Sequence, residues 1–153
     1  MKRIASFDVD HDVISKGIYI SRIDGDITTY DMRTRVPNMG DYMSNVTMHS
    51  VEHMFATYVR NGEIGQNVIY FGPMGCRTGF YLLVRDTAPE VVAKAVKDTL
   101  SKIINHDGEM FGATRKECGN YRELDLAEAK SEAKAEAKAY LEVLEGKEIT
   151  FKY

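Results

Sequence analysis

The sequence is poor in the features that mark several large functional classes. Only two of its 153 residues are cysteines, too few for a disulfide scaffold and typical of ligands or catalysts. No apolar run approaches the length of a membrane-spanning helix. The net charge is −3, so no basic field attracts nucleic acid, and no glycine-rich phosphate loop points to a nucleotide.

The N-terminus lacks a targeting signal of the secretory type. Residues 1–8 include two basic side chains but no apolar segment that could serve as the core of a signal peptide. We therefore expect a cytoplasmic protein without a membrane partner. The length fits one domain with a single core, which we assign to residues 1–153.

Alternating apolar residues and turn signals predict the secondary structure. The predicted strands cover residues 18–23, 27–36, 67–71 and 80–84, and the predicted helices cover residues 45–60, 88–104 and 126–145. Asp-Gly at 24–25 predicts a hairpin, and Thr87 to Glu90 predicts a capping box. Either Ser44 or Asn45 can cap the helix that ends near residue 60. Residues 105–120 are predicted to form a loop that could include a short strand, and residues 148–153 an edge strand or an irregular tail.

The last predicted helix repeats alanine, glutamate and lysine. Each glutamate has another glutamate four residues further on, and such rows of like charge are mildly unfavourable. The helix propensity of alanine, together with packing, must therefore stabilise the helix. We interpret its charged face as exposed to solvent and without a function. The predicted buried stripe is Leu126, Ala129, Ala133, Ala137, Leu141 and Leu144. Hairpin-linked strands followed by helices favour an α+β fold, a mostly antiparallel sheet packed against helices in a single-domain sandwich.

The most informative motif is H-x-x-E-H, formed by His49, Glu52 and His53. Residues four apart on a helix are neighbours, so the two imidazoles can bind one divalent metal, with the carboxylate beside them able to move protons. A catalytic site needs a third ligand, and Cys118, followed by a glycine, is the best candidate. Two imidazoles and a thiolate suit Fe²⁺, Zn²⁺ or Co²⁺.

The second cysteine, Cys76, lies in a turn with three glycines and a proline over residues 72–79. Such a turn can hold a thiol out into a cleft, where it could act as an acid or a base. Arg77 would favour the thiolate only if it pointed the same way. Two other readings stay open: an H-x-x-E-H metallohydrolase, in which the glutamate activates a metal-bound water, and a non-catalytic protein that binds a metal or ligand.

The motifs together resemble the S-ribosylhomocysteine lyases, which make the precursor of autoinducer-2. The shared segments are Ser6-Phe7 and Asp10-His11, Tyr30 to Arg33, Pro37-Asn38, His49 to His53, Pro73 to Tyr81, and Glu117 to Gly119. The resemblance extends over nearly the whole chain. It implies a lyase that cleaves S-ribosylhomocysteine to homocysteine and 4,5-dihydroxy-2,3-pentanedione by carbonyl migration and β-elimination.

The resemblance also implies roles for single residues. His49, His53 and Cys118 would bind one divalent metal per subunit, natively Fe²⁺. Cys76 and Glu52 would be catalytic, and Ser6, His11 and Arg33 would contact the substrate. The family forms homodimers with an active site at each interface, and it serves quorum sensing or the methyl cycle.

Three features depart from the family's usual sequence. Tyr70-Phe71-Gly72 replaces Asp-Ile-Ser, whose aspartate helps to hold the homocysteine part of the substrate. Arg35 stands where a cysteine is common, and the last helix differs from the usual family tail. We interpret the chain as a divergent member with the same chemistry.

Overall fold

The computed structural model describes residues 1–153 and contains one antiparallel sheet with the strand order β1-β2-β4-β3. The strands are β1 (Gly17–Asp24), β2 (Ile27–Arg33), β3 (Val68–Pro73) and β4 (Gly79–Arg85). The predicted hairpin is confirmed: Asp24 pairs with Ile27, and Gly25 has a φ of 62°. β2 ends before the predicted residue 36, because the amides of Thr34 and Arg35 both donate to the Thr78 carbonyl.

Four α-helices and two short 3-10 helices complete the fold. They are η1 (Ala5–Phe7), α1 (Asn45–Arg60), η2 (Gly65–Asn67), α2 (Pro89–Ile104), α3 (Tyr121–Leu124) and α4 (Ala129–Glu145). Ser44 caps α1 as predicted, since its side chain accepts a hydrogen bond from the Thr47 amide at 3.0 Å. The predicted capping box of α2 is wrong: the Thr87 hydroxyl donates to the Arg85 carbonyl instead, at 2.8 Å.

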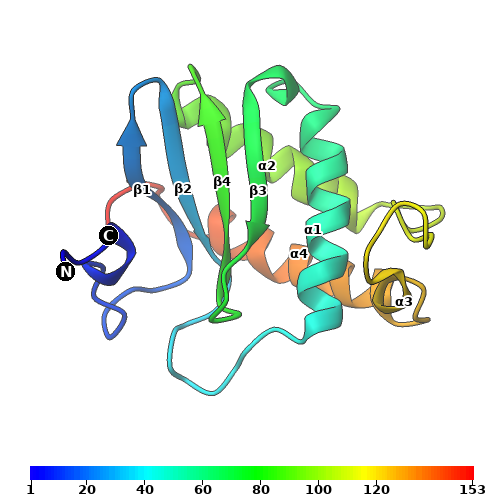
Figure 1. Ribbon diagram of the computed structural model, residues 1–153. Helices are drawn as coiled ribbons and strands as arrows, with labels where there is room; N and C mark the ends of the chain where they lie inside the picture. The colour runs from blue at the N-terminus through cyan, green and yellow to red at the C-terminus, as the bar shows by residue number, and fades with distance from the viewer.

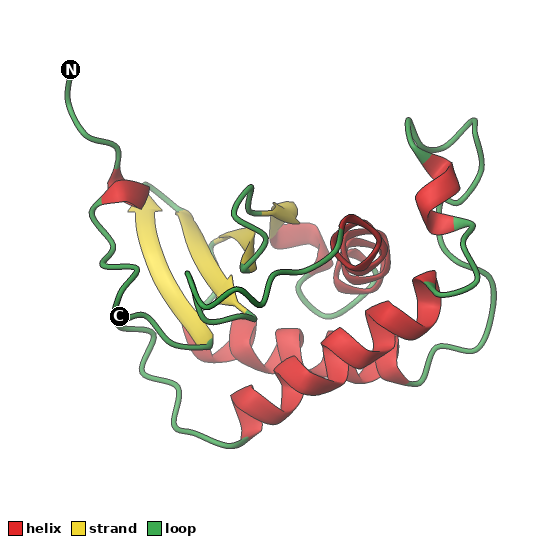
Figure 2. Ribbon diagram, turned by 90° about the horizontal axis from the view of Figure 1, so that it is seen from below, coloured by secondary structure: helices red, strands yellow, loops and turns green.

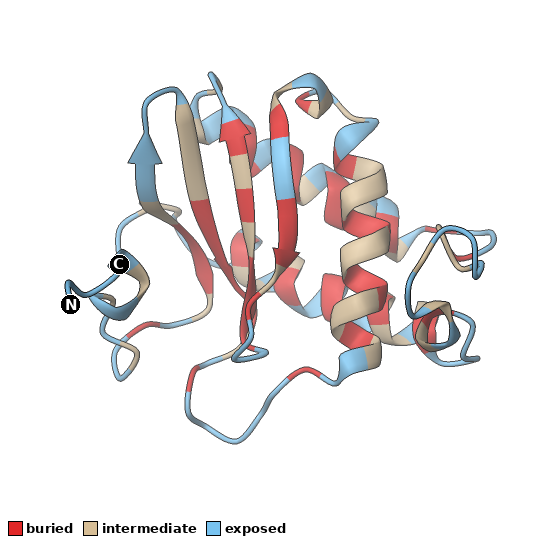
Figure 3. Ribbon diagram, in the orientation of Figure 1, coloured by how far each residue is buried: buried red, intermediate tan, exposed pale blue.

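The helices are arranged unevenly around the sheet. α2 and α4 cover one face, α1 lies beside the edge strand β3, and the other face stays open (Figures 1 and 2). Stacked rings join α1 to the sheet, with centroids 4.3 Å apart for Phe55 and Phe71 and 5.1 Å apart for Phe71 and Phe80. Figure 3 shows the buried positions on the surfaces where helices and strands face each other. The α+β prediction is confirmed.

The last helix begins at Ala129, three residues later than predicted, and its buried stripe differs in part. Ala129, Ala133, Ala137, Tyr140 and Leu144 are buried, whereas Leu126 is exposed and Leu141 only half-buried.

The prediction of a merely solvated charged face on α4 is wrong for two glutamates. Glu132 Oε2 accepts hydrogen bonds from the hydroxyls of Ser44 at 3.1 Å and Thr47 at 2.8 Å. Glu136 is buried and receives the Arg35 guanidinium, with Nε 3.2 Å from Oε1. These contacts fix α4 against the start of α1 and the end of β2, and they offset the like-charge row.

The segment after α4 returns to the sheet. Its backbone pairing with β1 is a single parallel bridge between Tyr19 and Phe151, so only one residue pair of the possible edge strand is formed. Among the helices, none combines the length and the apolarity needed to cross a bilayer.

Candidate metal centre

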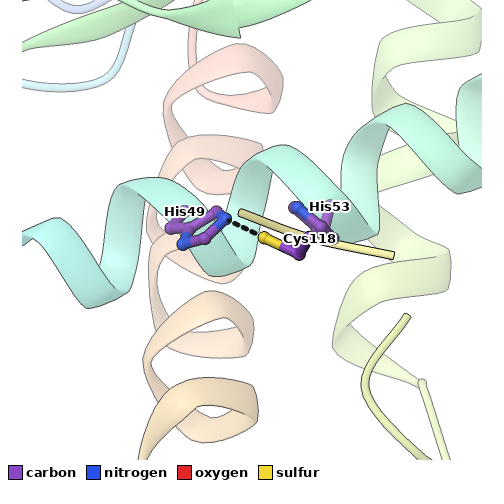
Figure 4. Close-up of side chains that lie close together, drawn as sticks. All are labelled: His49, His53 and Cys118. Atoms are coloured by element: carbon purple, nitrogen blue, oxygen red, sulfur yellow. Dashed lines mark hydrogen bonds between the residues drawn. The ribbon is translucent and has the colours of Figure 1, made fainter. Parts of the chain in front are cut away.

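Two histidines on α1 and one cysteine on the loop before α3 converge at one point (Figure 4). The rings of His49 and His53 have centroids 4.8 Å apart, and Cys118 Sγ lies 3.3 Å from His49 Nε2. One ligand atom from each of the three residues lies within 4.8 Å of the others. The three residues predicted as ligands therefore lie together in space, in a cluster that could hold a metal ion.

Both imidazoles are held so that one ring nitrogen remains available to a metal. His49 Nδ1 lies 3.0 Å from Glu123 Oε1, and His53 Nδ1 lies 2.9 Å from the Phe111 carbonyl oxygen. Because a carbonyl only accepts, His53 Nδ1 is the donor, and the carboxylate of Glu123 favours the same tautomer in His49. Such partners fix the orientation of a metal-ligating histidine and raise its basicity.

Local backbone geometry brings the loop close to these rings. Gly112 has a φ of 64°, and a Cβ at this position would lie only 2.8 Å from His53 Nδ1, so a side chain would displace the ring. The Asn120 amide donates to Cys118 Sγ at 3.4 Å, and Asn120 Nδ2 donates to Glu123 Oε1 at 2.7 Å. The short helix α3 thus positions Glu123 toward the cluster.

The donor set fits a divalent metal of intermediate softness. Two imidazole nitrogens and one sulfur provide the three protein ligands of a catalytic site, and the half-buried positions leave room for a further ligand. Glu123, Phe111, Gly112 and Asn120 were not predicted. The carboxylate of Glu123, five residues after Cys118, is the only one of them whose chemistry offered a signal in the sequence.

We expect Glu123→Ala to weaken metal binding about 10- to 100-fold, the range found when the partner of a metal-ligating histidine is removed. The reason is that His49 would lose the acceptor that holds its tautomer and ring orientation. Competition against a chromogenic chelator would measure the affinity. Glu128→Ala, which removes an exposed carboxylate just before α4, is the control and should leave it unchanged. Equal affinity in both variants would contradict this role for Glu123.

The second cysteine lies on a separate element. Cys76 is exposed in the turn between β3 and β4, with its Sγ 3.0 Å from Thr78 Oγ1 and 3.9 Å from Arg33 Nη1. The cation beside this thiol is therefore Arg33 and not Arg77, whose guanidinium lies over the Tyr42 ring, 5.5 Å from its centroid.

Arg33 is buried, with its side chain 2% exposed, and it is held by its own strand. Its Nε and Nη2 donate to the two oxygens of Asp31 at 3.1 and 2.7 Å, and its Nη1 donates to Thr78 Oγ1 at 2.8 Å. Burial acts to lower the pKa of Arg33, but the hydrogen bonds and charge of Asp31 outweigh it and hold the pKa above its ordinary value. Arg33 is thus a fixed cation behind Cys76.

None of the remaining predicted site residues is hydrogen-bonded to the side chains of the metal cluster. Ser6, in η1, lines a pocket of about 530 Å³ on the open face of the sheet, together with Tyr70 and Tyr81. His11 is partly buried, and its Nδ1 lies 2.8 Å from the Val9 carbonyl oxygen. Glu52 is half-exposed on α1, directly before His53.

The elements that carry these residues are separated within one chain. α1 lies between the β3–β4 turn, which holds Cys76, and α3, which lies beside Cys118 (Figures 1 and 2). The hydrogen bonds of Cys76 go to Thr78 and Arg33, and none reaches the metal cluster. A single chain thus brings together the three candidate metal ligands at one place, and Cys76 with Arg33 at another.

Comparison with known proteins gives one consistent family. The model of the S-ribosylhomocysteinase (LuxS) family matches residues 4–147. An S-ribosylhomocysteine lyase of Borreliella burgdorferi strain ZS7 is 41% identical over 160 residues, covering 100% of this chain and 99% of the relative. Proteins of the same name from Finegoldia magna and Phocaeicola vulgatus are 44% and 42% identical, covering 85% and 95% of this chain and 86% and 92% of the relatives.

Proposed function

The chain belongs to the S-ribosylhomocysteinase (LuxS) family, and from this premise we propose that it cleaves S-ribosylhomocysteine to homocysteine and 4,5-dihydroxy-2,3-pentanedione. The protein is a carbon–sulfur lyase that acts on a small molecule and has a single metal site. The observation that carries this function is the cluster of His49, His53 and Cys118 in a chain that matches curated lyases over its whole length.

The reaction needs proton transfers and no net oxidation. The C–S bond of the open-chain sugar breaks easily only when a carbonyl lies β to sulfur, so the carbonyl must first migrate from C1 to C3. A divalent metal on the two imidazoles and the thiolate would act as a Lewis acid toward the sugar oxygens and make the neighbouring C–H protons more acidic. Loss of the C4 proton then expels homocysteine as the leaving group.

The chain's own residues would move these protons. Cys76, as a thiolate, would take a proton from one sugar carbon and return it to the next carbon. Arg33 donates to Thr78 Oγ1, so the Thr78 hydroxyl can direct its own proton to Cys76 Sγ, and both groups favour the thiolate. Glu52, beside His53, would carry protons between the sugar oxygens. Ser6 and His11 would bind the substrate, and Arg33 would act through Cys76.

We further propose a homodimer in which each active site combines residues of both subunits. The separation of Cys76 from the metal cluster by α1 supports this arrangement, because a partner could bring its own β3–β4 turn to the cluster. The open sheet face, where Tyr70 is half exposed, offers an apolar surface for such a partner. We also propose that residues 1–153 act as one domain and that the protein works in the cytoplasm.

Fe²⁺ is the metal that we propose for the cell, with Zn²⁺ or Co²⁺ able to replace it. A mixed nitrogen and sulfur ligand set supports this choice over Mg²⁺ or Ca²⁺, which prefer oxygen ligands. The product would supply autoinducer-2 for quorum sensing, and the homocysteine would return to the methyl cycle.

Release of homocysteine tests the proposed activity directly. Purified protein loaded with Fe²⁺ under anaerobic conditions should produce free thiol from S-ribosylhomocysteine, with a turnover on the order of 10 per second, the median for enzymes. A colorimetric thiol reagent measures the homocysteine, and S-adenosylhomocysteine, which has no free sugar aldehyde, is the control substrate. Cleavage of peptides instead would favour a metallohydrolase, and metal binding without thiol release would favour a non-catalytic relative.

A further inference from the structure

The segment after α4 runs back along the edge of the sheet and ends beside the buried Asp31–Arg33 pair. The Ile20 amide donates to the Phe151 carbonyl at 2.9 Å, which fixes the backbone of the segment against β1. The Tyr153 ring stacks on Tyr19, with centroids 4.9 Å apart and an angle of 17° between the rings. The Tyr153 hydroxyl then donates to Asp31 Oδ2 at 2.7 Å.

This hydrogen bond joins Tyr153 to the catalytic thiol through three other side chains. Asp31 is 1% exposed and accepts from Tyr153 Oη and from Arg33 Nη2 on the same oxygen, each at 2.7 Å. Arg33 in turn donates to Thr78 Oγ1, which lies 3.0 Å from Cys76 Sγ. The whole chain of contacts joins three parts of the fold: the last segment, β2 and the β3–β4 turn.

We propose that Tyr153 is a positioning residue for Cys76, which it serves by holding Asp31 and Arg33 in the arrangement that favours the thiolate. The proposal rests on the proposed function only where it concerns turnover, because the state of the thiol can be measured without substrate. Nothing in the H-x-x-E-H motif or the glycine-rich turn indicates a role for this last segment.

The charges around Arg33 explain why one hydroxyl matters. Burial, followed by the charge of Asp31, raises the pKa of Tyr153, and burial likewise raises the pKa of Tyr81 and Tyr140, so these phenols keep their protons. Asp31 is therefore the negative group bonded to Arg33, and Cys76 Sγ is the other group that the guanidinium faces, at 3.9 Å. The hydrogen bond from Tyr153 partly neutralises the Asp31 carboxylate, which then attracts the Arg33 guanidinium less strongly. The positive charge of Arg33 can therefore stabilise negative charge on Cys76 Sγ more strongly.

Without that hydroxyl, Asp31 would have one buried acceptor site unsatisfied. The Asp31 carboxylate would then attract the Arg33 guanidinium more strongly. The interactions of Arg33 with Thr78 and Cys76 would become weaker. Folding would change little, because the ring stack on Tyr19 and the backbone bond to Ile20 would remain. The expected effect is thus on the thiol and on turnover, not on assembly of the fold.

The test compares Tyr153→Phe with the matched variant Tyr19→Phe. Both remove one hydroxyl from the same stacked pair, but the Tyr19 hydroxyl donates to the Ser15 carbonyl at 2.9 Å and does not contact Asp31. The rate at which iodoacetamide alkylates Cys76 would be measured at a series of pH values in the metal-loaded protein. Peptide mass spectrometry distinguishes Cys76 from Cys118, the other free cysteine.

Tyr153→Phe should slow Cys76 alkylation near neutral pH about three- to tenfold, the range that one hydrogen bond supplies, and should move the rising limb of the pH profile upward. Its kcat should fall by a similar factor with KM unchanged, while Tyr19→Phe should match the wild type. Melting temperatures would verify that both variants are folded.

Two results would overturn the proposal. One is a Tyr153→Phe profile identical to that of the wild type, and the other is an equal loss in Tyr19→Phe, which would assign the effect to packing of the segment. A wild-type protein without lyase activity would refute the proposed function, yet the alkylation profiles would still decide the role of Tyr153.

Discussion

Replacing Cys118 with alanine is expected to strip the protein of its metal and abolish homocysteine release. The sulfur is one of the three proposed protein ligands, and it lies 3.3 Å from His49 Nε2. Removing a residue that only hydrogen-bonds to a metal ligand lowers the affinity for the metal about 10- to 100-fold. Removing a ligand itself should therefore lower this affinity more than about 100-fold. Metal content after gel filtration, measured by elemental analysis, and turnover of S-ribosylhomocysteine should fall together.

Two comparisons separate loss of the metal from loss of the fold. Treating the wild type with a chelator should reproduce the inactive state of Cys118→Ala, and metal should restore only the wild type. The apo protein should also melt at a lower temperature than the loaded one, because a ligand bound by the native state stabilises it. A Cys118→Ala protein that keeps its full metal content would remove Cys118 from the ligand set.

The cluster of His49, His53 and Cys118 could be predicted because most of its signal is local. His49 and His53 stand four residues apart on a helix whose ends are marked by Ser44 and Asn61, so sequence spacing becomes distance directly. Cys118 was one of two cysteines available, and the structure confirms it beside the rings. Glu123 escaped prediction because its contact with His49 depends on a loop without a periodic pattern.

The fold was predictable to a similar degree. Apolar alternation and the Asp-Gly turn predicted the four strands of the sheet. The predicted end of β2 was too late, because the amides of Thr34 and Arg35 both donate to the Thr78 carbonyl and do not continue the regular strand pairing. Contacts between residues so far apart in the chain cannot be predicted from the local pattern of apolar residues.

The Asp31–Arg33 pair shows a signal that was present but not used. Residues two apart on a strand share one face, so an Asp-x-Arg sequence in β2 predicts that the two charges meet. The structure shows Arg33 buried and paired with Asp31, while the substrate contact that the resemblance implies for Arg33 stays a prediction. The partner Tyr153 is 122 residues from Asp31 and could not have been found by spacing.

Replacing Cys76 with alanine should lower kcat/KM by at least about 10³-fold while the metal stays bound, since proton transfer by a positioned group contributes 10²- to 10⁴-fold. The thiol is exposed, and its contacts are with Thr78 and Arg33, so its removal leaves the metal cluster intact. Elemental analysis should find normal metal content, and deuterium from heavy water should no longer enter recovered substrate. Full turnover in this variant would end the proposed role of Cys76.

The two inactive cysteine variants also test how the active site is divided between subunits. If Cys76 of one subunit serves the metal of its partner, a mixed dimer of Cys76→Ala and Cys118→Ala contains one complete site and one site lacking both groups. Random exchange of subunits should then restore about a quarter of wild-type activity, because half of the dimers are mixed and each has one working site. If both groups belonged to the same subunit, every site would lack one of them, and mixing would restore nothing. The separation of the β3–β4 turn from the metal cluster by α1 is the reason to expect restoration.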